Sequence, residues 1–226
     1  MENGRWPGLA PASFAKCPCG DIEQRSVNKM TSTEICNLAL SYLAKGRIMS
    51  MDDKTEEARQ CKLHYELCRK RLLSSYSWGF AKRTVRLAKL AATVPGWNYA
   101  YAYPAECLKI LLVFDEESAR HKEKERIDYE TVNIGTTKAV ITDTENAWAE
   151  YVSDEKDPDR FNVEFVEALA RLLAANMAMI LTGNANLMQT NHQLMQASVQ
   201  EAKLISVTER ERETEYPDNY ADARFR

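Results

Sequence analysis

The feature that most constrains the fold is a change in hydrophobic period along the chain. Apolar residues recur at helical spacing toward both ends, whereas polar and apolar residues alternate in the part that follows Trp78. Helices that flank a run of strands indicate an α+β domain. We therefore expect a four-helix bundle formed by both ends of the chain, with a β-rich insertion over about 79–152 and an extended C-terminal tail.

The first two helices are predicted at about 32–45 and 54–76. Thr31 and Glu34 have the spacing of a capping box, in which a hydroxyl and a carboxylate satisfy free N–H groups at a helix start. Gly46 stands where a C-terminal cap is expected. The apolar stripe of the second helix consists of Ala58, Cys61, Tyr65, Cys68, Leu72 and Tyr76.

The middle of the chain predicts strands. The strongest is 107–114, and 129–132 with 138–142 predicts a hairpin that turns at Asn133-Ile134-Gly135. The segment around Trp148 is either a strand or a short helix, and the charged segment 115–126 is a solvated hairpin tip or loop. Five side chains on the apolar phase of their elements should be mostly buried: Trp78, Phe80, Tyr101, Leu111 and Phe165.

Two later helices are predicted at about 159–182 and 190–213, which completes one domain over 30–214. In the last helix, the residues expected to face inward include Leu194, Ala197, Ala202 and Ile205. Residues 1–29 contain several glycines and prolines without a sustained period, which predicts a flexible N-terminal arm or a non-native extension. Residues 215–226 form the predicted tail.

Charge and hydropathy exclude several classes of protein. The formal net charge of −3 lacks the basic surplus of a nucleic-acid-binding domain. No stretch approaches the roughly 18 apolar residues that suggest a membrane span, and the N-terminus lacks the apolar core of a secretory signal. The six cysteines lack the paired spacing of a zinc or redox motif, so free thiols in a reducing compartment are expected.

No catalytic constellation is visible in the sequence. The histidines, His64, His121 and His192, lie in three distant segments, and no nucleotide-binding, metalloprotease or hydrolase motif occurs. Aromatic residues near basic ones can stack on bases, but aromatics at a period of two, such as Tyr99 and Tyr101, are more typical of a sheet core. We expect a protein that is not an enzyme and needs no cofactor or metal.

From about residue 31 to 213, the order and spacing of several segments resemble the tail tubular protein A family of podophages, the head-to-tail adaptors (connectors) of tailed bacteriophages. The segments that carry the resemblance are Ile35-Cys36-Asn37-Leu38-Ala39-Leu40, Trp78-Gly79-Phe80-Ala81, Trp97-Asn98-Tyr99-Ala100-Tyr101, Tyr103-Pro104, Cys107-Leu108-Lys109-Ile110, Tyr129-Glu130, Ile141-Thr142-Asp143, Asp157-Pro158 before Phe161 and Phe165, and Leu181-Thr182-Gly183.

The resemblance implies a structural virion protein in the neck of the phage, assembled in the host cytoplasm. Such an adaptor forms a homo-oligomeric ring, commonly of twelve copies, between the portal protein and the tail nozzle protein. The ring prolongs the DNA channel, helps to retain the genome and takes part in DNA ejection. Double-stranded DNA would pass through it without specific binding, and no membrane is involved.

Two sets of contact residues follow from this expectation. A ring closes by heterologous contacts, for which the charged surface of the second helix, with Lys62, Arg69 and Lys70, is a candidate subunit interface. The tail is the candidate portal-binding segment because aromatic and arginine side chains often anchor interfaces. Its anchors would be Tyr216, Tyr220, Phe225 and Arg226.

Two other readings stay open. The chain could be a helical interaction or scaffold module of another assembly, or an enzyme with an unrecognised site. Portal and tail genes beside its own would favour the adaptor, and a cleft with clustered carboxylates or histidines of perturbed pKa would favour the enzyme.

Overall fold

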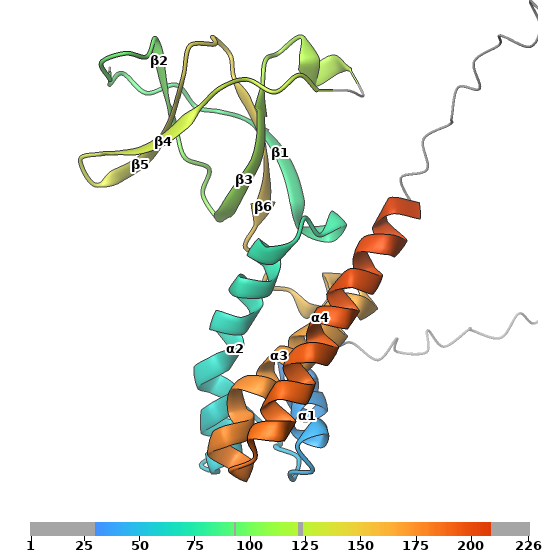
Figure 1. Cartoon of the computed structure of the whole chain (residues 1–226). Helices are drawn as coiled ribbons and strands as arrows, with labels where there is room; N and C mark the ends of the chain where they lie inside the picture. Colours follow the sequence, from blue (N-terminus) through green and yellow to red (C-terminus); the bar gives the residue numbers. More distant parts are fainter. Residues whose placement is uncertain (1–29, 93, 122–123, 209–226) are drawn as a thin grey trace, which may run out of the picture.

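The computed structural model describes residues 30–92, 94–121 and 124–208. It is an α+β structure in which four helices are interrupted, between α2 and α3, by two small three-stranded antiparallel sheets. Figure 1 shows the helices gathered at one end and the sheets at the other. The predicted α+β class and the helix–strand–helix order are therefore confirmed, while residues 1–29 and 215–226 lie outside the described ranges.

The two N-terminal helices begin as the sequence indicates. Helix α1, Ser32–Tyr42, has the full capping box: Glu34 N–H donates to the Thr31 hydroxyl, and Thr31 N–H donates to the Glu34 carboxylate at 2.7 Å. The predicted cap at Gly46 is wrong, because α1 ends earlier and Ala44 takes the left-handed conformation, with φ of 53°. Helix α2, Glu56–Ser75, begins after its N-cap Thr55.

The two C-terminal helices begin at other residues than predicted. The prediction of a helix from 159 is wrong, because the segment Pro158–Arg160 forms the 3-10 turn η3 and Asn162 caps α3, Val163–Thr182. Gly183 then ends α3 with φ of 66°. Helix α4, Ala185–Thr208, starts about five residues before the predicted 190, and the Asn184 side chain accepts hydrogen bonds from its first N–H groups.

Helix α3 is the centre of the helical end. Helices α1, α2 and α4 all pack against it, with α4 making the most extensive contact (Figure 1). Within the described ranges, α3 is also the one helix that is long and apolar enough, by length and composition, to cross a membrane. The expectation that no stretch has this character is therefore corrected. Most of the apolar stretch is buried in the fold, as is usual for a core helix.

The first sheet has the strand order β1-β6-β3 and stands next to the helices (Figure 1). Strand β3, Cys107–Phe114, has the predicted bounds, and the segment around Trp148 is a strand, β6, Trp148–Ser153. Strand β1, Lys82–Arg86, follows the 3-10 turn η1, Gly79–Ala81. The Ser153 hydroxyl donates to Ala81 O at 3.0 Å, which ties the end of β6 to this turn.

The second sheet has the order β2-β5-β4. Strands β4, Glu130–Ile134, and β5, Thr137–Thr142, form the predicted hairpin. Its turn is at 135–136 and not at 133–135 as predicted, because Asn133 and Ile134 still pair with β5. Strand β2, Tyr99–Ala102, pairs with the other edge of β5. A small second core lies between the sheets around Tyr101, Val113 and Val140. The charged segment between β3 and β4 contains the 3-10 turn η2, Ser118–Arg120.

Candidate functional site

The charged residues predicted for a subunit interface on α2 have different environments. Lys62 is 66% exposed and pairs with Asp52 at 2.7 Å, and Lys70 is 48% exposed and lies 3.6 Å from Asp154. Arg69 is 0% exposed, so the prediction that it lies on a charged surface is wrong. The reason is its position: it shares the inner side of α2 with Leu72 and Leu73.

The buried guanidinium of Arg69 is held by carboxylates. Its Nη2 contacts Glu66 Oε2 and its Nη1 contacts Asp154 Oδ1, both at 2.7 Å, and it also donates to the backbone carbonyl of Glu155. Burial alone would lower the pKa of Arg69, but hydrogen bonds to the two carboxylates raise it above its ordinary value. This cation therefore joins α2 to the segment after β6 and is not available to another molecule.

Glu155 makes a second set of ion pairs where the helices meet the first sheet. Its carboxylate, 11% exposed, lies 3.0 Å from Arg83 on β1 and 3.1 Å from Arg160 in η3. These contacts connect the first sheet with the segment that leads into α3. The role that the charges support is structural, because each nearby cation already has a carboxylate partner.

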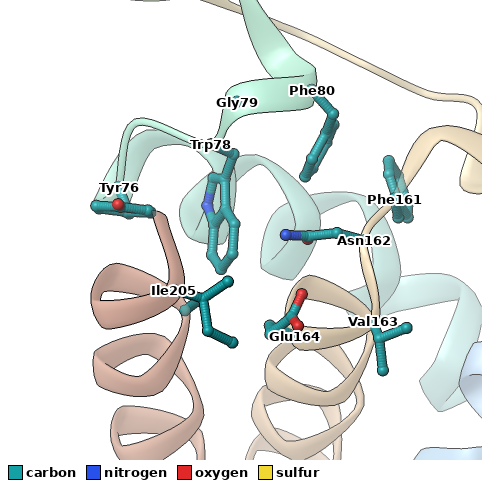
Figure 2. A pocket seen from close by; sticks show the side chains of 10 residues that line it. Tyr76, Trp78, Gly79, Phe80, Phe161, Asn162, Val163, Glu164 and Ile205 are labelled. Atoms are coloured by element: carbon teal, nitrogen blue, oxygen red, sulfur yellow. The ribbon is translucent and has the colours of Figure 1, made fainter. Parts of the chain in front are cut away.

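An aromatic pocket of about 560 Å³ lies where α2 runs into the first sheet. Figure 2 shows Tyr76, Trp78 and Phe80 on one part of its wall, with Phe161 and Ile205 on others. Trp78 is 1% exposed, and its Nε1 donates to Leu72 O at 3.0 Å. The lining is mixed, because Asn162 and Glu164 lie on it together with the aromatic rings (Figure 2).

The burial prediction for the core is confirmed. Trp78, Tyr101 and Phe165 are almost completely buried, while Phe80 and Leu111 are partly buried and pack against the helical core. Rings of Trp78, Phe80, Phe161 and Phe165 contact one another with centroids about 5 to 6 Å apart. Most of this aromatic cluster thus fills the junction between helices and sheet.

The described residues contain no group of three or more histidines, cysteines or acids placed to hold a metal ion. Cys36, Cys61 and Cys68 are free and buried, whereas Cys107 is free and partly buried. A hydrogen bond with Cys61, together with burial, raises the pKa of the Cys36 thiol, and burial raises that of Cys68. Thiols of raised pKa carry little thiolate and are poor nucleophiles at neutral pH. Cys17 and Cys19 lie outside the described ranges.

The surface that sequence reasoning missed is on α4. From Leu172 to Gln200 the chain has no Asp, Glu, Lys or Arg, although charged residues make up 28% of the whole. Much of this uncharged run is nevertheless exposed on α4. We call this surface the outer face of α4, defined by the exposed residues Gln189, Thr190, Gln193, Leu194, Gln196, Ala197, Gln200, Glu201 and Leu204.

Two of the four inward residues predicted for this helix belong to the outer face. Leu194 is 41% exposed and Ala197 is exposed, while Ile205 is 39% exposed, so the prediction holds for Ala202 alone. The residues that face α3 are instead Asn191, Met195, Ser198, Val199 and Ala202. Helix α4 therefore has two faces poor in charge, and one of them is covered within the subunit.

Helix α2 has a smaller exposed apolar surface, the pair Leu63 and Leu67. Both side chains are 66% exposed, and they are one helical turn apart. Lys62, Glu66 and Lys70 lie beside them on the same helix. The helical end of the molecule thus presents an exposed leucine pair on α2 and, on α4, a mostly uncharged polar face that contains Leu194 and Leu204.

No protein-family model matches the chain, and no curated protein is similar enough in sequence to count as a match. The four residues predicted to bind a portal, Tyr216, Tyr220, Phe225 and Arg226, lie outside the described ranges.

Proposed function

We propose that the chain is a structural subunit of a tailed bacteriophage, the head-to-tail adaptor that joins the portal to the tail nozzle. In this proposal the four helices form the bundle that is the body of the subunit, and residues 30–214 form one adaptor domain. Copies of the chain, twelve in the family that it resembles, form a ring that prolongs the DNA channel. No enzymatic activity, cofactor or membrane is part of the proposal.

The observation that carries the proposal is the outer face of α4. A surface helix of a monomer usually has a charged side toward water. Here that side consists of glutamine, threonine, alanine and leucine, with Glu201 as its one acid. The central parts of protein interfaces are depleted of charge in this way. The face therefore suits a subunit whose neighbours cover it.

The electrostatics support a passive conduit. The chain has 30 basic and 33 acidic residues, so it has no surplus of cations with which to neutralise phosphates. The resemblance of the sequence to the tail tubular protein A family points to the same role.

The test is to mix the purified chain with the portal protein from the same genome and to image the particles by electron microscopy. We expect a closed ring stacked on the tail-facing end of the portal, with a copy number measurable by native mass spectrometry. If the chain and the portal stay separate and no stacked ring is seen, the adaptor role is contradicted. Association into another kind of complex without a ring would favour the alternative of a scaffold module.

A further inference from the structure

We infer that the outer face of α4 packs against the Leu63 and Leu67 surface of α2 in a second copy of this chain. This inference rests on the ring proposed above and specifies which two surfaces meet in it. Helix α4 packs chiefly on α3, and the side chains of its outer face are exposed in the described part of the subunit.

The spacing of the exposed residues suits a helix partner. Thr190, Leu194, Ala197, Glu201 and Leu204 follow one another at intervals of four and three residues, which places them in one row along α4. Residues spaced alternately by four and three positions form the strip along which two helices pack side by side. Beside it runs a row of glutamines, Gln189, Gln193, Gln196 and Gln200, that can accept and donate hydrogen bonds at the edge of such a contact.

The partner surface on α2 is complementary in length and charge. Helix α2 has 20 residues and α4 has 24, so they are about 30 and 36 Å long and can lie along each other. Lys62, Glu66 and Lys70 lie beside the two leucines of α2 and together carry a net charge of +1, although Lys62 also pairs with Asp52; the row on α4 contains the acid Glu201. Since the two faces lie on different helices, their contact is heterologous and can close into a ring.

The size of the contact predicts how it forms. A helix 36 Å long and about 10 Å wide has a footprint of about 360 Å², which is less than half of the about 800 Å² that each partner contributes to a stable interface. The free chain should therefore associate weakly. A ring would form when a portal holds neighbouring copies in place.

A charge-swap experiment tests the pairing in the full chain. Leu194→Glu places a carboxylate in the centre of the α4 row, and Leu67→Lys places a cation on α2. Each change alone should weaken association between copies by at least about tenfold, because it buries an unpaired charge. The double variant should recover most of the loss, since the two new charges meet across the interface. Circular dichroism checks that each variant keeps its helical signal.

The matched control is Val163→Glu, which places the same acid at a side chain that is 77% exposed and lies outside both surfaces. It should assemble on the portal like the natural chain. Normal assembly of Leu194→Glu would overturn the inference. So would a double variant that stays as defective as the single ones, because the α4 face would then meet something other than α2.

A second measurement does not depend on the portal. A benzophenone amino acid in place of Leu194 is illuminated in a concentrated mixture of isotopically light and heavy full chain. Light-to-heavy cross-links into α2 support the inference, whereas cross-links to another α4, or none between copies, overturn it. If the natural chain forms no ring on the portal but these cross-links still reach α2, the adaptor role fails and the pairing stands.

Discussion

The buried guanidinium of Arg69 joins helix α2 to the segment that follows the first sheet. It contacts Glu66 within α2 and Asp154 just after β6, each at 2.7 Å. A charge removed from water is stable only while its partners remain in place. The same holds for the carboxylate of Asp154, which is 11% exposed and faces Arg69. Reversing the charge of Arg69 would therefore test folding rather than assembly.

Replacing Arg69 with alanine should lower the free energy of unfolding by about 3–5 kcal/mol, because Asp154 is then left buried without its close cation. Urea denaturation measures the change. The matched control is Lys70→Ala, which removes a cation 3.6 Å from the same carboxylate but at a site 48% exposed. An exposed pair contributes at most about 1 kcal/mol. Equal losses in the two variants would show that burial of Arg69 does not decide its role.

Glu150 on β6 predicts a dependence of stability on pH. Burial raises the pKa of its carboxyl, but hydrogen bonds to Lys82 and Lys124, at 2.7 and 2.9 Å, outweigh burial and lower the pKa overall. The folded pKa thus lies below the unfolded value of about 4.3. The stabilisation is complete above that value and is lost as the pH falls through the folded pKa.

We therefore expect Glu150→Gln to be less stable than the natural chain at pH 7, by about 1 kcal/mol, with the difference shrinking as the pH falls below about 4.3. Urea midpoints across this range measure it. Glu145→Gln is the control, because it removes a pair with Lys89 that is more than half exposed on both sides. A difference that stays constant down to pH 3 would contradict the assignment.

At the scale of elements, the helix ends show where local signals suffice. The capping box of α1 was predictable because Thr31 and Glu34 act within one turn. The end of α1 was not, because Ala44 takes the left-handed conformation with φ of 53°, although nearby Gly46 could adopt it without strain. Tertiary contacts fix this turn: the Asn37 side chain exchanges two hydrogen bonds with the backbone of Ile48.

The left-handed conformation of Ala44, a residue that is not glycine, gives a prediction about stability. Ala44→Gly should raise the free energy of unfolding by about 0.5–1 kcal/mol, since glycine relieves a left-handed cost of roughly 1–2 kcal/mol but loses more entropy on folding. Gly46→Ala is the matched control: Gly46 has an ordinary φ, and an added Cβ meets nothing within 4 Å. It should be neutral or slightly stabilising. Thermal unfolding of both variants decides, and destabilisation by Ala44→Gly would show that the turn is not strained.

At the same scale, α4 shows why part of the candidate site could not be predicted. Its inner residues and its outer row are offset by one position, about 100° around the helix, and both are poor in charge. Periodicity alone does not say which row faces α3. The strands were easier, because β3 is a short and almost continuous apolar run and the β4–β5 hairpin has a turn at Gly135 with φ of 62°.

At the scale of the whole molecule, the helices and the sheets lie at opposite ends (Figure 1). The two sheets have their own small core. The leucine pair of α2 and the outer face of α4 both belong to the helical end. The junction between the ends contains the aromatic cluster around Trp78 and the ion pairs of Arg69 and Glu155. Both ring contacts and ion pairs therefore connect the helices with the first sheet.

The last prediction concerns the predicted tail, 215–226, which lies outside the described residues. The helical and sheet cores are built within residues 30–208, so deleting 215–226 should leave the unfolding midpoint unchanged. The deleted segment contains Tyr216, Tyr220 and Phe225, residues of the kind that anchor interfaces. Under the adaptor proposal, portal binding should fall at least about tenfold in a pull-down titration. A truncated chain that binds the portal as tightly as the full one would place the portal contact elsewhere. A variant with only the three aromatic residues replaced by alanine separates their contribution to binding from that of the tail's charges.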